Sequence, residues 1–218
     1  MPDKMAQNKQ SGENAQSYNM WYLTKHFSLK DYFVNVRKFT GERLMIHIHP
    51  LRAIDFLRFS KMKVLSVGPR NESEIFKLVS VGFKLENIES IDLHTYSKLI
   101  TLGDMANIPF DKDKFDLVIV GWVLVYTNEI EKSIKELIRV TKNNGIISIC
   151  SSHGKKIRKV FSEDYIESSE EILGSSNKIL SFFNDSIGDV IFKYHPFDEN
   201  NKDHLNSKRS NYLIKIKK

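Results

Sequence analysis

Strand-like and helix-like patterns alternate between residues 61 and 150, and this alternation restricts the fold more than any other feature of the sequence. Short apolar runs with the length of buried strands lie at 64–67, 88–93, 115–120 and 146–150. Helical patterns separate them, and the clearest has one apolar face made of Ile130, Ile134, Leu137 and Ile138. Strands that alternate with helices are typical of a parallel sheet with right-handed crossovers. We therefore expect an α/β fold, Rossmann-like and doubly wound, with a mostly parallel sheet.

The chain before this stretch has a different composition. Residues 1–17 are polar and cannot bury enough apolar surface to offset the entropy lost on ordering, so we expect a mobile tail. Aromatic and apolar residues recur through 18–60, which predicts an N-terminal helical extension. Within it, Pro50 suits the first position of a helix. The main domain is then expected to span 61–218.

The end of the chain predicts a change in strand direction. Strand-like runs at 189–194 and 211–216 flank a polar loop rich in Asn, Asp and Lys, and a helix is expected over 168–183. This spacing fits a long hairpin. We therefore expect the sheet to finish with a C-terminal antiparallel pair.

Local signals mark the ends of several elements. Gly82 suits the stop of the helix after the first strand, because glycine adopts a positive φ without penalty. Asn128 and Glu131 have the spacing of a capping box at the start of a later helix. The sequence Asn143-Asn144-Gly145 predicts a turn before the last parallel strand.

Composition excludes several classes of site. Cys150 is the single cysteine, so neither a disulfide framework nor a cysteine-rich zinc site can form within the chain. His47 and His49 alternate on one side of a possible strand, but no third ligand is evident, and we expect no metal site. The net charge of +6 is too small to indicate a nucleic-acid partner by itself. We find neither a secretory leader nor an apolar run of the ~20 residues that cross a bilayer, so we expect a cytoplasmic protein without a membrane span.

Two passages of the central stretch resemble those of class I S-adenosylmethionine-dependent methyltransferases of the small-molecule type. Residues 103–110 (GDMANIPF), followed by 114–118 (KFDLV), are similar to the family's GD-x-x-x-(L/I)-P-F … FD-(L/V)-V. Residues 136–140 (ELIRV) before Gly145 resemble its E-(L/I)-x-R-V-(L/S)-(K/R)-x-x-G helix and turn. The resemblance implies a seven-stranded sheet, S-adenosylmethionine as cofactor, and methyl transfer to a small or medium-sized acceptor.

The resemblance also implies where the cofactor binds. Ligands of open parallel sheets bind beyond the carboxyl ends of the strands, where the strand order reverses. The implied cofactor contacts are Val67, Gly68, Pro69, Arg70, Asp92, Leu93, Asp104, Met105 and Gly121. Asp92 would accept hydrogen bonds from the ribose hydroxyls, and its alternative is a strand-end aspartate that caps a turn. Asp104 would contact the adenine amino group beside Met105, and its alternative is an ordinary polar turn.

The first loop departs from the family pattern D-x-G-x-G-x-G. Gly68 is the one glycine that remains; Pro69 follows it, and Arg70 and Glu72 occupy glycine positions. Side chains at these positions must point away from the cofactor, or the cofactor must sit differently. Arg70 could meet the methionyl carboxylate in a bidentate contact. The alternative is a solvated arginine or an ion pair with Glu72 or Glu74.

Two residues follow the fourth and fifth strands on the expected acceptor side. Tyr126 and His153 are the candidate catalytic bases, needed only if the acceptor must lose a proton, and ordinary packing or solvation is the alternative for both. The basic run at 155–159 predicts either a solvated surface or a loop that binds an anionic acceptor. The fourth strand ends in 120–123 (VGWV), without the Asn/Asp-Pro-Pro-aromatic motif of amino-methylating nucleic-acid enzymes. We therefore expect a small-molecule acceptor and no specific nucleic-acid partner.

Three functions compete for this pattern. The leading hypothesis is a methyltransferase. The altered first loop motivates the second, a catalytically inactive methyltransferase-like protein with a binding or regulatory role. The third is a nicotinamide-dependent oxidoreductase, because Asp92 would suit that ribose too, but the absent G-x-G-x-x-G motif and the terminal hairpin count against it. The sequence predicts neither the target atom nor the oligomeric state.

Overall fold

The computed structural model of the chain describes residues 42–54, 57–69, 72–93, 95, 97–124, 127, 129–152, 176–194 and 209–218. The tail expected at 1–17, most of the expected helical extension and the first part of the helix expected over 168–183 lie outside these ranges. Within them, no helix is long and apolar enough to span a membrane.

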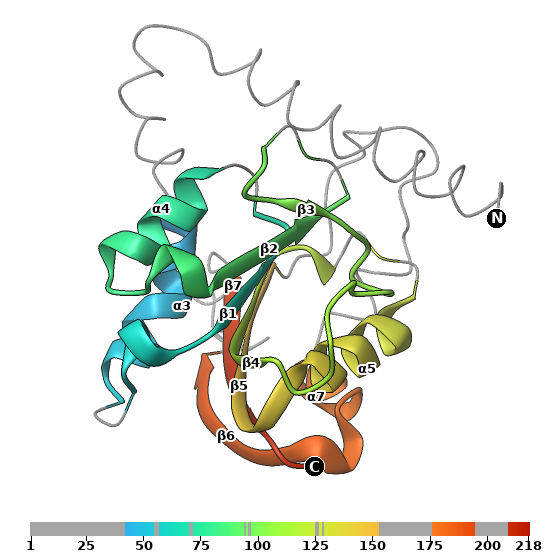
Figure 1. Ribbon diagram of the computed structural model, residues 1–218. Coiled ribbons are helices and arrows are strands. Elements are labelled where there is room, and N and C mark those ends of the chain that lie inside the picture. The colour runs from blue at the N-terminus through green and yellow to red at the C-terminus, as the bar shows by residue number, and fades with distance from the viewer. Residues whose placement is uncertain are drawn as a thin grey trace, which may run out of the picture.

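A seven-stranded sheet in the order β3-β2-β1-β4-β5-β7-β6 forms the centre of the molecule (Figure 1). Its strands are β1 (Val64–Val67), β2 (Ile88–Asp92), β3 (Thr101–Leu102), β4 (Phe115–Gly121), β5 (Thr141–Ser152), β6 (Ile187–Tyr194) and β7 (Arg209–Ile216). The first five strands are parallel, and β7 is antiparallel to both β5 and β6. The strand order reverses between β1 and β4. This arrangement confirms the predicted doubly wound sheet with a terminal antiparallel hairpin.

Helices cover both faces of the sheet (Figure 1). They are α3 (Glu42–Arg52), α4 (Glu72–Ser80), α5 (Ile130–Val140) and α7 (Ser176–Ser181), with short 3-10 turns η1 (Phe59–Lys61), η2 (Leu85–Asn87) and η4 (Asn184–Ser186). Residues Leu117 and Ile119 of β4 belong to the core formed with α3 and α4, whereas Val118 and Val120 belong to the core formed with α5 and α7. Side chains alternate across a strand. A strand buried on both faces is therefore apolar almost throughout, as β4 is.

Helix α3 corrects the prediction that a helix begins at Pro50. Pro50 instead lies near the end of α3, which runs from Glu42 to Arg52. Proline has no backbone N–H, so it cannot bond the carbonyl four residues earlier, that of Ile46. In this structure the side-chain amide of Asn211, on β7, donates to the Ile46 carbonyl oxygen at 2.5 Å. A distant residue thus replaces the missing helical hydrogen bond.

Replacing Asn211 with alanine is expected to lower the free energy of unfolding by about 1–3 kcal/mol, because the Ile46 carbonyl would be left without its donor. The loss should be smaller in a Pro50→Ala background, where the restored backbone N–H can bond the same carbonyl. Urea unfolding of the wild type, both single variants and the double variant measures this coupling. An Asn211→Ala loss that is the same in both backgrounds would contradict the exchange of donors.

Three local predictions have different outcomes. Gly82 has φ +116° and closes α4, as predicted. The N-cap of α5 is Glu129 rather than Asn128, and its side chain makes no capping hydrogen bond; the Glu129 N–H donates to the Thr127 hydroxyl at 3.1 Å. The turn predicted at 143–145 is a bulge inside β5, where the register with β4 shifts and the middle residue has φ +63°.

Candidate functional site

The carboxyl ends of β1, β2 and β3 meet at one edge of the sheet. The Gly68 N–H donates to the Ile91 carbonyl at 2.8 Å, and the Gly103 N–H donates to the Asp92 carbonyl at 2.9 Å. These two bonds continue the strand pairing past the end of each strand. The structure therefore brings together three of the predicted cofactor positions: Gly68, the end of β2 at Asp92, and the turn that begins at Gly103 and contains Asp104.

Gly68 is at the turn after β1, and only a glycine fits there. Its φ of +68° is in the left-handed region, and a Cβ atom built on it would lie 2.2 Å from Cγ1 of Val123. Val123 belongs to the turn after β4, so the two turns interlock where the strand order reverses. Pro69, which follows, is buried. The one glycine left from the family's glycine-rich loop is thus required by packing within the protein.

The turn after β4 holds a bulky residue in an uncommon conformation. Trp122 has φ +59°, which is rare for a large side chain and marks a conformation held by its surroundings. Its backbone N–H donates to the Cys150 carbonyl of β5 at 3.1 Å. Its ring contacts the His47 ring edge-on, with 6.0 Å between the ring centroids. His47 Nδ1 lies 2.7 Å from the Ser148 hydroxyl. These contacts among Trp122, His47 and Ser148 were not predicted from the sequence. The one signal for them is the presence of polar residues at buried positions.

The two histidines considered as metal ligands do not share a face. They lie on α3, not on a strand, with His47 buried and His49 exposed. Two residues apart on a helix, they point about 200° apart around its axis. No cluster of three or more metal-ligating side chains occurs among the described residues.

The Asp104 turn combines a structural bond with an available oxygen. Asp104 Oδ1 accepts the Ala106 N–H at 2.8 Å, and the Asn107 N–H donates to the Asp104 carbonyl at 2.9 Å. One carboxylate oxygen therefore makes the ordinary polar turn that was the alternative for this residue. The other oxygen, Oδ2, makes no hydrogen bond to a described residue. The Met105 side chain is buried in the core beside α5.

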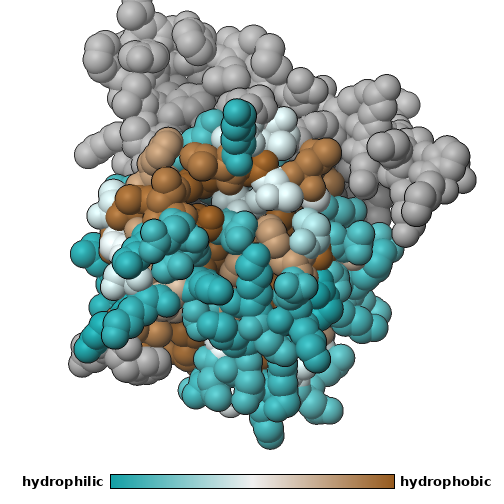
Figure 2. Space-filling view, in the orientation of Figure 1, coloured by the Kyte–Doolittle hydropathy of each residue, from teal (hydrophilic) through white to brown (hydrophobic). Residues whose placement is uncertain are grey.

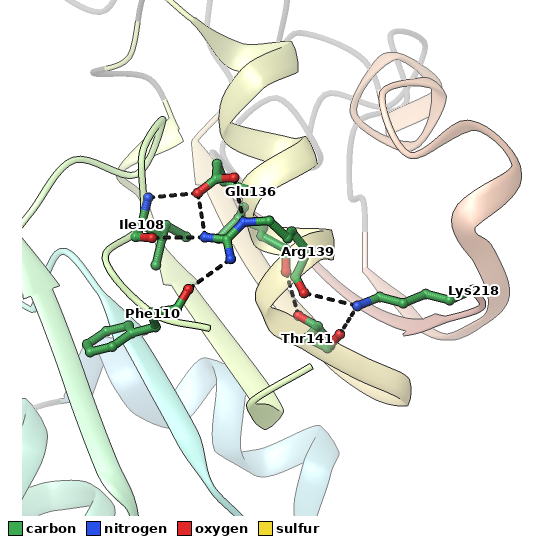
Figure 3. Close-up of polar contacts among 7 residues, drawn as sticks. Ile108, Phe110, Glu136, Arg139, Thr141 and Lys218 are labelled. Carbon is green, nitrogen blue, oxygen red and sulfur yellow. Dashed lines mark hydrogen bonds and ion pairs between the residues drawn. The ribbon is translucent and has the colours of Figure 1, made fainter. Parts of the chain in front are cut away.

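An ion pair on α5 connects that helix to the loop after β3 (Figure 3). Arg139 donates through Nε to Glu136 Oε1 and through Nη2 to Oε2, both at 2.7 Å. The guanidinium lowers the pKa of the Glu136 carboxyl, and the Ile108 backbone N–H lowers it further, against the opposing effect of burial. The same contact raises the pKa of Arg139. Both groups are therefore charged at neutral pH.

The other predicted site residues are placed as follows. Val67 is buried at the end of β1, Leu93 is half-buried just after β2, and Gly121 ends β4. The predicted residues that lie outside the described ranges are Arg70, Tyr126 and His153.

Two surface features lie away from this edge. A cavity of about 410 Å³ at the amino-terminal edge of the sheet is lined by cationic, polar and apolar side chains, and its carboxylate, Asp116, is bonded to Lys142 Nζ at 2.7 Å. On and beside α4, Phe76, Val79 and Leu85 are exposed, and Figure 2 shows hydrophobic surface over this helix. Neither feature contains a predicted cofactor residue.

The central stretch of the chain is similar to known methyltransferases. Residues 76–149 match the family described as methyltransferase domain. A demethylmenaquinone methyltransferase from Desulfitobacterium hafniense (strain Y51) is 41% identical over 54 residues, which are 24% of this chain and 21% of that protein. The matched segment thus spans about a fifth of that relative's length.

Solved structures share the fold at low identity. The CurJ carbon methyltransferase has a TM-score of 0.59 and 13% identity, over 90% of this chain and 61% of that one. The N-methyltransferase NodS from Bradyrhizobium japonicum WM9, in complex with S-adenosyl-L-homocysteine, has a TM-score of 0.53 and 13% identity, over 80% of this chain and 87% of that one. The family match makes residues 76–149 similar to methyltransferase domains, and the solved structures named above share the fold of this chain.

Proposed function

We propose that this chain transfers a methyl group from S-adenosylmethionine to a small-molecule acceptor. The observation that carries the proposal is the meeting of Gly68, Asp92 and the Asp104 turn at the carboxyl ends of β1, β2 and β3, beside the point where the strand order reverses. In open α/β sheets this is where ligands bind. The family match over 76–149 supports the same chemistry.

The residues at this edge suit the cofactor. A carboxylate at the end of β2, that of Asp92, is the acceptor that two ribose hydroxyls require. Asp104 Oδ1 accepts a hydrogen bond within the turn. The Oδ2 atom is available to accept a hydrogen bond from an adenine amino group. We propose Val67, Pro69, Leu93, Met105 and Gly121 as the neighbouring contacts, and Arg70 as the partner of the methionyl carboxylate.

Methyl transfer places few chemical demands on the protein. S-adenosylmethionine, when bound, would supply a methyl group on a positively charged sulfur. An acceptor atom that attacks the methyl carbon displaces the sulfur directly. The chain's own residues then have to orient the two reactants and exclude water, which supplies much of the acceleration. The interlocked turns at Gly68 and Val123 give this edge a fixed shape. A base is needed only where the acceptor must lose a proton, and Tyr126 and His153 are our candidates.

Ligand preference tests the proposal. We expect isothermal titration calorimetry at millimolar ligand to detect binding of S-adenosylmethionine or S-adenosylhomocysteine, and to detect weaker or no binding of NAD. NAD and the two sulfur-containing ligands all offer a ribose to Asp92. NAD also carries a pyrophosphate, and the chain lacks the glycine pattern that brings a pyrophosphate close to a helix N-terminus. Equal or tighter NAD binding would overturn the assignment.

A binding or regulatory protein without turnover is the second candidate. The buried Pro69 and the loss of two glycines in the first loop favour it. Conversion of S-adenosylmethionine to S-adenosylhomocysteine in the presence of acceptors separates the two candidates. A suitable panel contains a demethylated quinol and an amine, after the relatives named above, together with an anionic acceptor.

A further inference from the structure

The loop between β3 and β4 is held at its start and near its middle. At its start, the Gly103 N–H donates to the Asp92 carbonyl at 2.9 Å. Near its middle, Arg139 Nη2 donates to the Ile108 carbonyl at 2.9 Å and Nη1 donates to the Phe110 carbonyl at 2.8 Å. Figure 3 shows the two bonds from Arg139, which join α5 to a segment about thirty residues earlier in the chain.

Glu136 holds the same part of the loop from the acceptor side. Its Oε2 atom accepts the Ile108 N–H at 2.9 Å, while both of its oxygens are bonded to Arg139. Ile108 therefore has its N–H and its carbonyl fixed by one ion pair, and Phe110 has its carbonyl fixed as well. The peptide groups that carry the Ile108 N–H, the Ile108 carbonyl and the Phe110 carbonyl cannot shift without breaking charge-assisted hydrogen bonds.

Pro109 transmits this restraint to the start of the loop. A Cβ atom on Gly103 would lie 3.1 Å from Cδ of Pro109, so the proline ring is packed against the residue that precedes Asp104. The ion pair therefore fixes the segment around Pro109. The Pro109 ring in turn packs against Gly103, which begins the short turn that carries Asp104.

We propose that Glu136 and Arg139 are positioning residues for recognition of the cofactor's adenine, because they fix the loop on which Asp104 Oδ2 is presented to the amino group. This inference rests on the proposed function. Neither residue touches the cofactor in this scheme. Each acts through Ile108, Phe110 and Pro109.

A second ion pair, at the start of α5, offers a matched control. Glu129 and Lys132 are also three residues apart, at 3.1 Å, and their side chains are 55% and 50% exposed. Among the described residues, Lys132 donates hydrogen bonds to Glu129 and not to the loop. Exposed pairs of this kind contribute about 0–1 kcal/mol to stability. Removing each pair's cation therefore separates loss of an ion pair on α5 from loss of the restraint on the loop.

The experiment compares two ligands on matched variants. S-adenosylhomocysteine carries the adenine amino group, and S-inosylhomocysteine carries a carbonyl oxygen at that position, which a carboxylate repels. We expect wild type to prefer the adenine ligand by roughly tenfold or more, as for a charged hydrogen bond. Arg139→Gln and Glu136→Gln should reduce that preference at least about threefold, whereas Lys132→Gln should leave it unchanged. Calorimetry gives the affinity of each of the four proteins for each of the two ligands, and thermal unfolding without ligand confirms that each variant folds.

Asp104 tests the route by which the ion pair acts. In an Asp104→Ala background the preference for adenine should already be lost, and Arg139→Gln should then reduce it no further. If Arg139→Gln and Glu136→Gln lower the melting temperature but keep the wild-type preference, the ion pair is structural only and the inference is wrong. If wild type binds neither ligand, the proposed function fails, and this inference fails with it.

Discussion

Gly68→Ala is expected to lower the free energy of unfolding by about 2–5 kcal/mol. The added Cβ would lie 2.2 Å from Val123 Cγ1, so either the turn after β1 or the turn after β4 must move. Overpacking of this kind costs about 1–3 kcal/mol, and the left-handed φ of +68° adds about 1–2 kcal/mol for a residue with a side chain. A typical domain has only about 5–15 kcal/mol in total. Urea unfolding measures the loss.

Two variants separate the packing cost from the backbone cost. Gly82 also has a positive φ, of +116°, but a Cβ there would meet nothing closer than Phe59 Cβ at 3.8 Å. Gly82→Ala should therefore show a backbone cost without a packing cost. Adding Val123→Ala to Gly68→Ala should recover part of the loss, because it removes the methyl groups that the new Cβ meets. Failure of Val123→Ala to recover any stability would show that the two turns are not interlocked.

Asp92→Ala is expected to weaken S-adenosylhomocysteine binding at least tenfold, with little change in the melting temperature without ligand. The variant removes two charge-assisted hydrogen bonds of roughly 1.5–3 kcal/mol each before compensation by water. Strand β2 should persist, because its pairing with β1 and β3 uses backbone groups. Calorimetry and thermal unfolding check the two halves of the prediction.

Ligand variants provide the control for Asp92. Adenosine and 2′,3′-dideoxyadenosine differ only in the two ribose hydroxyls that we assign to this carboxylate. Wild type should prefer adenosine, and Asp92→Ala should bind both nucleosides about equally. A preference that survives the substitution, or an unchanged affinity for S-adenosylhomocysteine, would mean that the carboxylate has a structural role at the end of β2.

The centre of the sheet was predictable because β1 and β4 are buried on both faces. The runs at 64–67 and 115–120 are apolar almost throughout, and this pattern leaves few alternatives to a strand covered by helices on both sides. The hairpin at 189–194 and 211–216 was predictable for a similar reason, since each run has strand composition. Strand β3 has two residues, both exposed, and so carries no hydrophobic pattern at all.

The errors and omissions arise from contacts between distant parts of the chain. Pro50 signals a helix start locally, and only the amide of Asn211 explains why a helix can contain it. The meeting of Gly68 and Asp92 could be predicted because parallel strands place their carboxyl ends together. The hydrogen bond from Arg139 to the Ile108 carbonyl could not be predicted, because the motif around Arg139 gives no information on which loop the side chain contacts.

The lengths and shapes of the outer strands bear on how this protein behaves at high concentration. An outer strand presents unpaired backbone groups on which another chain can add a strand of its own. On one side the sheet ends in β3, which offers two residues. On the other it ends in β6, whose register with β7 shifts twice and whose exposed residues include Asp189 and Lys193. Irregular backbone and exposed charge both oppose strand addition at the β6 edge, and the shortness of β3 opposes it at the other.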